Sequence, residues 1–176
     1  MTCIVGLEHD GRVTIGGDAA AVGEMRIVAR VDPKVFRVGP YLIGFTESFR
    51  MGQLLRFTLD VPEQTSTADD FEHLCTVFVD AVRQCFRDGG VARDDHGEET
   101  GGSFLVGYRG ALYCVDDDYH VGRSVLGYES IGCGSEFALG SLASTTGNPR
   151  RRILTALAAA ALHSVGVCEP FTTLSI

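Results

Sequence analysis

The chain is predicted to have an α+β fold in which two β-sheets face each other and each carries a pair of helices on its outer side. Two observations predict it. The segments follow the order strands, two helices, strands, two helices, strand, and the helical segments carry apolar residues along one face. Two sheets, each covered by a helix pair, bury every apolar face of such a set.

The first third of the chain predicts strands. Residues 9–12 (His-Asp-Gly-Arg) have the composition of a tight turn, because Asp and Gly tolerate the backbone angles that turns require. We expect 27–31 and 35–38 to form a strand pair across Asp32-Pro33. The predicted strands are Cys3–Leu7, Val13–Gly17, Ile27–Val31, Val35–Val38 and Tyr41–Phe45.

The middle of the chain predicts two helices, flanked by loops at 62–66 and 88–102. The first carries Met51, Leu54, Leu55 and Leu59 at helical spacing. In the second, apolar residues recur at i, i+3, i+4, i+7, i+8 and i+11 from Phe71, which is one stripe on a 3.6-residue period. Thr67, with Asp70 three residues later, fits an N-terminal cap.

The last third predicts strands, two helices and a closing strand. Arg109-Gly110 is a two-residue turn signal between the strands Phe104–Tyr108 and Ala111–Val115. A short strand at Glu129–Ile131 follows. One helix begins near Ser135, and another begins at Asn148-Pro149, where Asn is a cap and Pro suits the first helical position. Phe171–Ile176 is the final strand.

Composition excludes several classes of protein. A length of 176 residues fits one domain, over 1–176. The net charge of −8 argues against a nucleic-acid partner, since phosphate contacts need clustered Lys and Arg. No apolar stretch is long enough for a membrane span, and no export signal is visible, so we expect a cytoplasmic protein with free thiols. The Cys and His spacings predict no metal, and no cofactor is expected.

The N-terminal segment resembles a known family. Thr2-Cys3-Ile4-Val5-Gly6 followed by Gly16-Gly17-Asp18 looks like the start of proteasome β-subunits and of the bacterial HslV peptidase, which begin with Thr-Thr-Ile-Val-Gly and carry a Gly/Ala-Asp pair at the same distance. Lys34 follows Asp18 at the family's interval. Residues 132–140 (Gly-Cys-Gly-Ser-Glu-Phe-Ala-Leu-Gly) resemble the family's Gly-Ser-Gly segment and the helix that it begins.

The resemblance spans nearly the whole chain and implies a four-layer αββα sandwich of the N-terminal nucleophile hydrolases. It implies that Thr2, uncovered by removal of Met1, is the nucleophile of a threonine peptidase. A free α-amine has a pKa of roughly 7.7–8.0, so it can act as the base for its own hydroxyl near neutral pH. Lys34 would lower the pKa of that amine by charge repulsion, and Asp18 would hold Lys34 in place.

Three departures from the family pattern concern the site. Cys133 stands where the family has a Ser that supports the Thr amine, and a thiol is the weaker hydrogen-bond partner; the alternative is a small buried apolar Cys. Thr46, Glu47 and Ser48 replace Gly-rich residues whose backbone N–H stabilises the oxyanion, and a carboxylate facing the site would oppose negative charge. The late helix lacks the family's acidic residue, for which His163 or Ser164 are the candidate substitutes.

Three functions remain open from the sequence. The first is a peptidase of HslV or related type that assembles into homo-oligomeric rings, acts on peptides or unfolded proteins and is fed by an ATP-dependent unfoldase, as the resemblance implies. The Ala-rich helix segment Ile153–Leu162 also favours close contact with another subunit. The second is a proteasome-fold scaffold with weak or no catalysis, and the third is an amidase for small amides.

Overall fold

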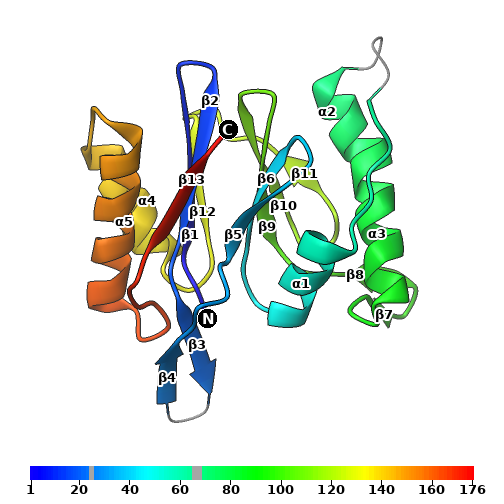
Figure 1. Ribbon diagram of the computed structural model, residues 1–176, viewed down its shortest axis with the longest axis horizontal. Coiled ribbons are helices and arrows are strands. Elements are labelled where there is room, and N and C mark those ends of the chain that lie inside the picture. The colour runs from blue at the N-terminus through cyan, green and yellow to red at the C-terminus, as the bar shows by residue number, and fades with distance from the viewer. Residues whose placement is uncertain (24–25, 65–68) are drawn as a thin grey trace.

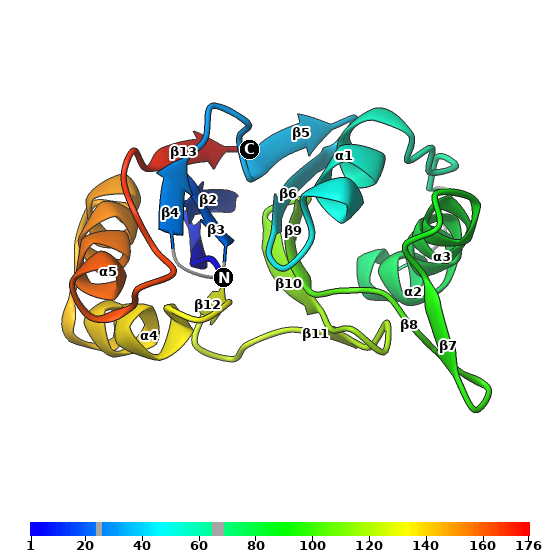
Figure 2. The ribbon, with the colours of Figure 1, turned by 90° about the horizontal axis from the view of Figure 1, so that it is seen from below.

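Four layers of secondary structure (helices, sheet, sheet, helices) make up the part of the chain that the computed structural model describes, residues 1–23, 26–64 and 69–176 (Figure 2). The predicted α+β sandwich and its order of elements are therefore confirmed. The short β3–β4 hairpin projects beyond the sheets near the N-terminus (Figure 1).

Both sheets are antiparallel. The first has the order β12-β1-β2-β13, with strands Tyr128–Ile131, Ile4–His9, Arg12–Gly17 and Thr172–Ser175. The second has the order β11-β10-β9-β6-β5, with strands Val121–Gly122, Ala111–Val115, Phe104–Tyr108, Tyr41–Phe45 and Val35–Val38. The predicted hairpin turns have the expected backbone, since Asp10, Gly11, Arg109 and Gly110 all have positive φ.

Helices cover the outer face of each sheet. α4 (Ser135–Ser144) and α5 (Pro149–His163) lie on the first sheet, and Asn148 caps α5 by accepting a hydrogen bond from the Arg151 N–H. The second sheet is covered by α1 (Phe49–Phe57) and by a long helix made of α2 (Asp70–His73), a π-helical turn at Leu74–Phe78 and α3 (Val79–Asp88). Buried clusters fill the three spaces between the four layers.

One predicted strand pairing was wrong. The chain at 26–29 does not pair with 35–38: β4 (Arg26–Ala29) pairs with β3 (Ala20–Gly23), and β5 pairs with β6. Gly39, with φ 52°, makes the tight turn that brings β6 back onto β5. All four residues of β4 are exposed, so that strand forms a local hairpin and does not enter either large sheet.

Two smaller predictions also need correction. The predicted loop 88–102 contains a hairpin, β7 (Arg93–Asp95) and β8 (Glu98–Thr100), whose Glu99 carboxylate binds Arg83 and Arg87 on α3. Thr67 lies outside the described residues, and the side chain that caps α2 is Asp69, which accepts from the N–H groups of two residues that follow it.

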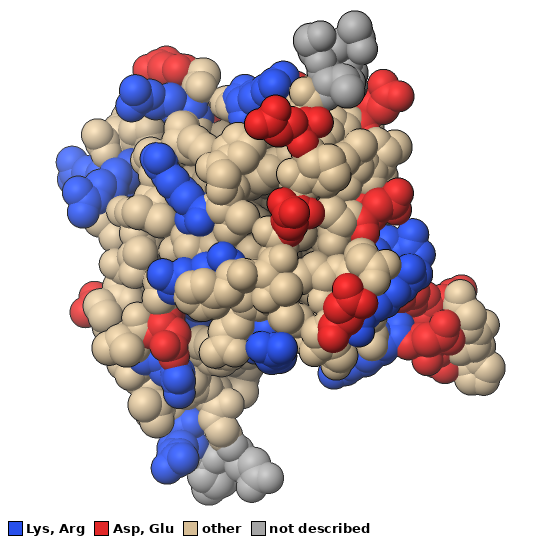
Figure 3. Space-filling view, turned by 45° about the vertical axis from the view of Figure 1, so that its right-hand side comes forward, with Lys and Arg blue, Asp and Glu red and all other residues tan. Residues whose placement is uncertain are grey.

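Charged side chains are mixed on the face shown in Figure 3, where Lys and Arg lie among Asp and Glu with neutral surface between them. The net charge of −8 is therefore not gathered into one patch on that face. Among the described helices, none is long and apolar enough to cross a membrane.

Candidate active site

The residues singled out from the sequence lie at one end of the two sheets, where several strands begin or end. Thr2 precedes β1, Asp18 follows β2 and Cys133 follows β12. Ile4 pairs with Gly17 on one side and with Ile131 on the other. Because antiparallel strands place paired residues side by side, the residues just beyond these pairs meet at the same edge.

Lys34 comes from the other sheet, directly before β5. A glycine allows the two sheets to approach here. A Cβ on Gly17 would lie 2.8 Å from Ile4 Cδ1, 3.0 Å from Val35 Cγ2 and 3.7 Å from Lys34 Cβ. Any larger residue at 17 would push β5 away, so this glycine in the Gly-Gly-Asp segment positions Lys34 as well as Asp18.

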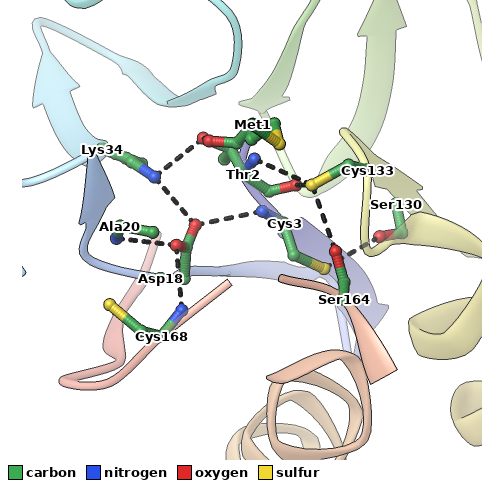
Figure 4. A network of polar contacts seen from close by, with 10 residues as sticks. All are labelled: Met1, Thr2, Cys3, Asp18, Ala20, Lys34, Ser130, Cys133, Ser164 and Cys168. Carbon is green, nitrogen blue, oxygen red and sulfur yellow. Dashed lines mark hydrogen bonds and ion pairs between the residues drawn. The ribbon is translucent and has the colours of Figure 1, made fainter. Parts of the chain in front are cut away.

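Lys34 connects Asp18 to Thr2 (Figure 4). Its Nζ donates to Thr2 Oγ1 at 2.7 Å and to Asp18 Oδ1 at 2.9 Å. The Asp18 carboxylate also accepts from three backbone N–H groups, those of Cys3 at 3.0 Å, Ala20 at 2.8 Å and Cys168 at 3.4 Å. The carboxylate is thus held rigidly, and through it the Lys34 ammonium is aimed at the Thr2 hydroxyl.

The Lys34–Asp18 pair is taken out of water. The two side chains are 1% and 0% exposed. Burial lowers the pKa of Lys34, and the Asp18 carboxylate opposes that shift. Burying one charge without the other would leave it uncompensated, so the two groups depend on each other. The pair supplies a fixed, dry cation within hydrogen-bond distance of Thr2 Oγ1.

Cys133 contacts the backbone of Thr2 on the opposite side. Its Sγ accepts from the Thr2 N–H at 3.3 Å and lies 3.5 Å from the Thr2 carbonyl oxygen. Ser164 Oγ, just after α5, donates to the same sulfur at 3.3 Å. Cys133 is exposed, so the alternative prediction of a small buried cysteine was wrong. Cys3 points into the core, where burial raises its thiol pKa to about 12.

Gly132 makes room for the Thr2 backbone. Its φ is 94°, and a Cβ there would lie 2.3 Å from the Thr2 carbonyl oxygen and 3.1 Å from Thr46 Oγ1. Both the conformation and the space therefore require glycine. The segment 132–134 positions Cys133 because its first residue has no side chain.

Residues 46–48 follow β6 and lie beside Gly132 and the Thr2 backbone. Glu47 has φ 67°, which is unusual for a residue with a side chain. Its carboxylate accepts from the Ser103 N–H at 3.3 Å, while the Thr46 N–H donates to the Ser103 carbonyl oxygen. The Glu47 carboxylate is therefore tied to the strand entering β9.

Met1 is in place in the structure and occupies space beside Thr2. Its carbonyl oxygen accepts from Thr2 Oγ1. A Cβ on Gly166 would lie 2.5 Å from Met1 Cβ and 2.6 Å from Cys133 Sγ, so the Met1 side chain rests against this glycine and near that sulfur. In this form the Thr2 nitrogen is an amide whose lone pair is delocalised into the Met1 carbonyl group, so it cannot act as a base.

The fold brings together all four predicted catalytic residues, Thr2, Asp18, Lys34 and Cys133. Of the two candidates near the end of α5, Ser164 contacts the site, whereas the His163 ring packs on Phe137. The backbone donor of residue 168 could not be found from the sequence, since a backbone N–H leaves no residue-type signal. Within the described residues, no group of three or more His, Cys, Asp or Glu could hold a metal ion.

Comparison with known proteins shows similarity at the level of structure. No family model and no curated protein sequence matches the chain. Among solved structures, BPH from Thiobacillus denitrificans, determined in complex with epoxomicin, superposes with a TM-score of 0.81 at 16% identity, covering 99% of this chain and 98% of that one.

Two further structures agree. HslV from Trypanosoma brucei has a TM-score of 0.68 at 18% identity, with 99% of this chain and 98% of that one covered. Anbu from Hyphomicrobium sp. strain MC1 has a TM-score of 0.71 at 13% identity, with coverage of 98% and 80%. The chain therefore has the fold shared by HslV and the proteasome-like peptidases.

Proposed function

We propose that the chain is a threonine-type peptidase whose nucleophile is the Thr2 hydroxyl, exposed when Met1 is removed. The observation that carries the proposal is the contact between the buried Lys34 ammonium and Thr2 Oγ1, with Asp18 behind it. An apolar residue would stabilise the core better than a buried Lys paired with an Asp. The position of Lys34 against the Thr2 hydroxyl therefore points to a role in chemistry.

The base in this mechanism is the α-amine of Thr2. Once Met1 has left, the amine takes the Oγ1 proton while Oγ1 attacks the carbonyl carbon of the scissile amide, forming a tetrahedral oxyanion. The amine then gives that proton to the leaving nitrogen, and the acyl group stays on Oγ1. Water releases it in a second step with the same amine as base.

Lys34 supports both states of this cycle. Its positive charge beside the amine keeps the amine's pKa low, so the base is unprotonated at neutral pH. Its hydrogen bond to Oγ1 stabilises negative charge that develops there as the proton leaves. Asp18 acts by position, because it fixes Lys34 without contacting Oγ1.

Cys133 and Ser164 hold the Thr2 amine at the positions where the family has a Ser and a carboxylate, but with different functional groups. The Cys133 sulfur is the hydrogen-bond acceptor for the Thr2 nitrogen, and the Ser164 hydroxyl donates to that sulfur. The Cys133 sulfur and the Ser164 hydroxyl thus take the positions of the family's Ser and carboxylate. Sulfur is a weak hydrogen-bond acceptor, so it holds the amine less firmly than a hydroxyl oxygen would.

The oxyanion donor is assigned to the backbone N–H of Glu47. Of the three N–H groups at 46–48, that of Thr46 donates to Ser103 and that of Ser48 donates to the Thr46 carbonyl oxygen. The Glu47 N–H is the one of the three without an acceptor in the described part of the chain. A backbone donor of this kind serves any substrate side chain.

The substrate class is a peptide or an unfolded protein segment. We infer that copies of the chain assemble into rings in the cytoplasm that enclose the sites and receive substrate from an ATP-dependent unfoldase. The likeness of the fold to HslV and BPH supports the substrate class and the assembly. A single domain over residues 1–176 carries the site.

The test is a pair of measurements on purified protein. Intact mass reports the loss of Met1 and any covalent adduct with epoxomicin, the compound bound in the BPH complex. Hydrolysis of a short fluorogenic peptide reports activity. We expect wild type to lose Met1, take up one epoxomicin per chain at residue 2 and cleave the peptide, and Thr2→Ala to do neither of the last two.

The control is Thr14→Ala. Thr14 lies in β2 with its hydroxyl bonded to Ser175, so this change removes a Thr hydroxyl from the same sheet and leaves the site intact. Full activity in Thr2→Ala would exclude Thr2 as nucleophile. A Met1-free wild type without activity or adduct would replace the proposal with a scaffold of the same fold.

A further inference from the structure

Cys133, which stands where the family has a serine, places a third nucleophilic atom, its Sγ, beside the Thr2 nitrogen and Thr2 Oγ1. The sulfur lies 3.3 Å from the nitrogen, inside the range of roughly 3–3.5 Å from which bound groups react. Its side chain is exposed, so a small molecule can reach it.

Met1 marks where a carbon attached to the Thr2 nitrogen lies. Its carbonyl carbon is bonded to that nitrogen, and its Cβ and Cγ lie 2.5 Å and 3.1 Å from the position that a Cβ on Gly166 would take. The same position is 2.6 Å from Cys133 Sγ. When Met1 leaves, the place of its half-exposed side chain beside Gly166 and the Cys133 sulfur becomes free.

We propose that the chain with residue 2 at its N-terminus captures aldehydes through the Thr2 amine and the Cys133 thiol, as a cyclic N,S-acetal. The inference rests on the uncovered N-terminus of the proposed function and does not depend on peptidase activity. The ligand class is an unbranched aliphatic aldehyde, whose carbon chain takes the place of the Met1 side chain.

The chemistry balances without an oxidant or reductant. The amine attacks the aldehyde carbon, and loss of one water leaves a C=N bond. The Cys133 sulfur then adds to that carbon and its thiol proton passes to the nitrogen, so one C–N and one C–S bond replace the C=O bond. The carbon oxidation state is unchanged, and water addition reverses the reaction.

The thiol reacts in preference to the Thr2 hydroxyl, because sulfur is the stronger nucleophile toward an imine carbon at neutral pH. Rotation about the Cβ–Cα bond of the exposed Cys133 brings sulfur the remaining distance to the carbon. A serine at 133 would lack this reactivity.

Capture shuts off the proposed peptidase, because the nitrogen lone pair and the sulfur acceptor are both consumed. The site would then respond to free aldehydes, regaining activity as the aldehyde is diluted. This response depends on the Cys133 thiol and on the α-amine of residue 2, and not on the Thr2 hydroxyl.

The test uses Thr2→Ala in the full chain, so that no hydroxyl at residue 2 competes. The protein is made as a cleavable fusion whose removal leaves residue 2 at the N-terminus, and butanal is the probe. Intact mass should rise by butanal minus one water. Cys133 should become protected from alkylation by iodoacetamide, while the exposed Cys75 remains reactive.

Three comparisons decide the outcome. Adding Cys133→Ser should raise the butanal concentration for half-saturation by ~10-fold or more, since the intramolecular second bond is lost. Gly166→Ala should weaken capture because its methyl crowds the sulfur. The chain with Met1 retained can form only an imine at its own α-amine, so its Cys133 should stay open to alkylation. The same butanal concentration for half-saturation with and without Cys133, or alkylation of Cys133 in the adduct, would overturn the capture site. Failure of the proposed peptidase would appear separately, as a protein that carries Thr2 at its N-terminus and does not cleave the peptide.

Discussion

Lys34 is the residue whose charge matters most for the proposed chemistry. We predict that Lys34→Met lowers kcat/KM for a fluorogenic peptide by at least ~100-fold, the lower range for a positioned acid–base or electrostatic group. This variant leaves the buried Asp18 charge without its cation, which costs stability, but three backbone N–H groups still donate to the carboxylate, so the fold should survive. Arg30→Met, which removes an exposed cation nearby in sequence, is the control and should stay within a few-fold of wild type. A similar loss in both variants would argue against a specific role for Lys34.

Cys133 is the second residue with a testable role. If its sulfur is the weakened acceptor for the Thr2 amine, Cys133→Ser should raise kcat, because a hydroxyl accepts a stronger hydrogen bond. Thermal stability should change little, since the side chain is exposed. The matched control is Cys75→Ser, an exposed cysteine in the helix layer of the other sheet. An unchanged kcat in Cys133→Ser would show that the thiol fills space beside Thr2 without acting as a hydrogen-bond acceptor in catalysis.

The long helix over the second sheet carries a buried histidine. His73 is 2% exposed, and its Nε2 lies 2.7 Å from Tyr41 Oη. Burial lowers the pKa of His73, the Arg109 cation lowers it further, and Asp70 opposes the shift. The folded state therefore binds this proton less readily than the unfolded chain, whose histidines titrate near 6.5.

His73 makes the stability of the folded chain depend on pH. Above the unfolded pKa His73 is neutral in both states, so its contribution to stability is intact. As the pH falls below about 6.5, the unfolded state gains a proton that the folded state resists, and the free energy of unfolding decreases. We predict that denaturant unfolding at pH 7.5 and 5.5 shows a loss that is smaller in His73→Gln than in wild type. His163→Gln, at an exposed histidine, should keep the wild-type loss.

The whole molecule is predicted to self-associate. In α5, Ile153, Ala156, Leu157 and Ala160 are fully buried against the first sheet, but Ala158 and Leu162 face outward, the latter 80% exposed. Ala-rich outer faces let helices approach closely, and an apolar outer face without a partner is costly in water. Light scattering at micromolar concentration should give a mass several times 18.9 kDa.

A single change probes that surface. Leu162→Glu places a charge on the outer face of α5 without touching the core or the site, and should reduce the mass toward that of one chain. Glu136→Gln in α4 removes a charge nearby and is the control. A monomer in wild type at that concentration would contradict the assembly.

Local patterns in the sequence were enough to predict the layered fold. The turn at 9–12 and the hairpin at 109–110 need particular residue types, and the apolar stripe from Phe71 has one helical period, so each element could be read within its own segment. The resemblance to the proteasome and HslV family, and not a local pattern, implied that Thr2, Asp18 and Lys34 belong together.

Tertiary structure decided what lies between segments. Short strands have several possible partners, and burial chooses among them, so the exposed 26–29 segment pairs locally while 35–38 joins a sheet. The stacking of the two sheets at Gly17 decides that Lys34 reaches the Thr2 hydroxyl, and the end of α5 decides that Ser164, not His163, reaches Cys133. Residue types indicate which chemistry is possible, but distances of about 3 Å between segments over 100 residues apart depend on how the layers pack.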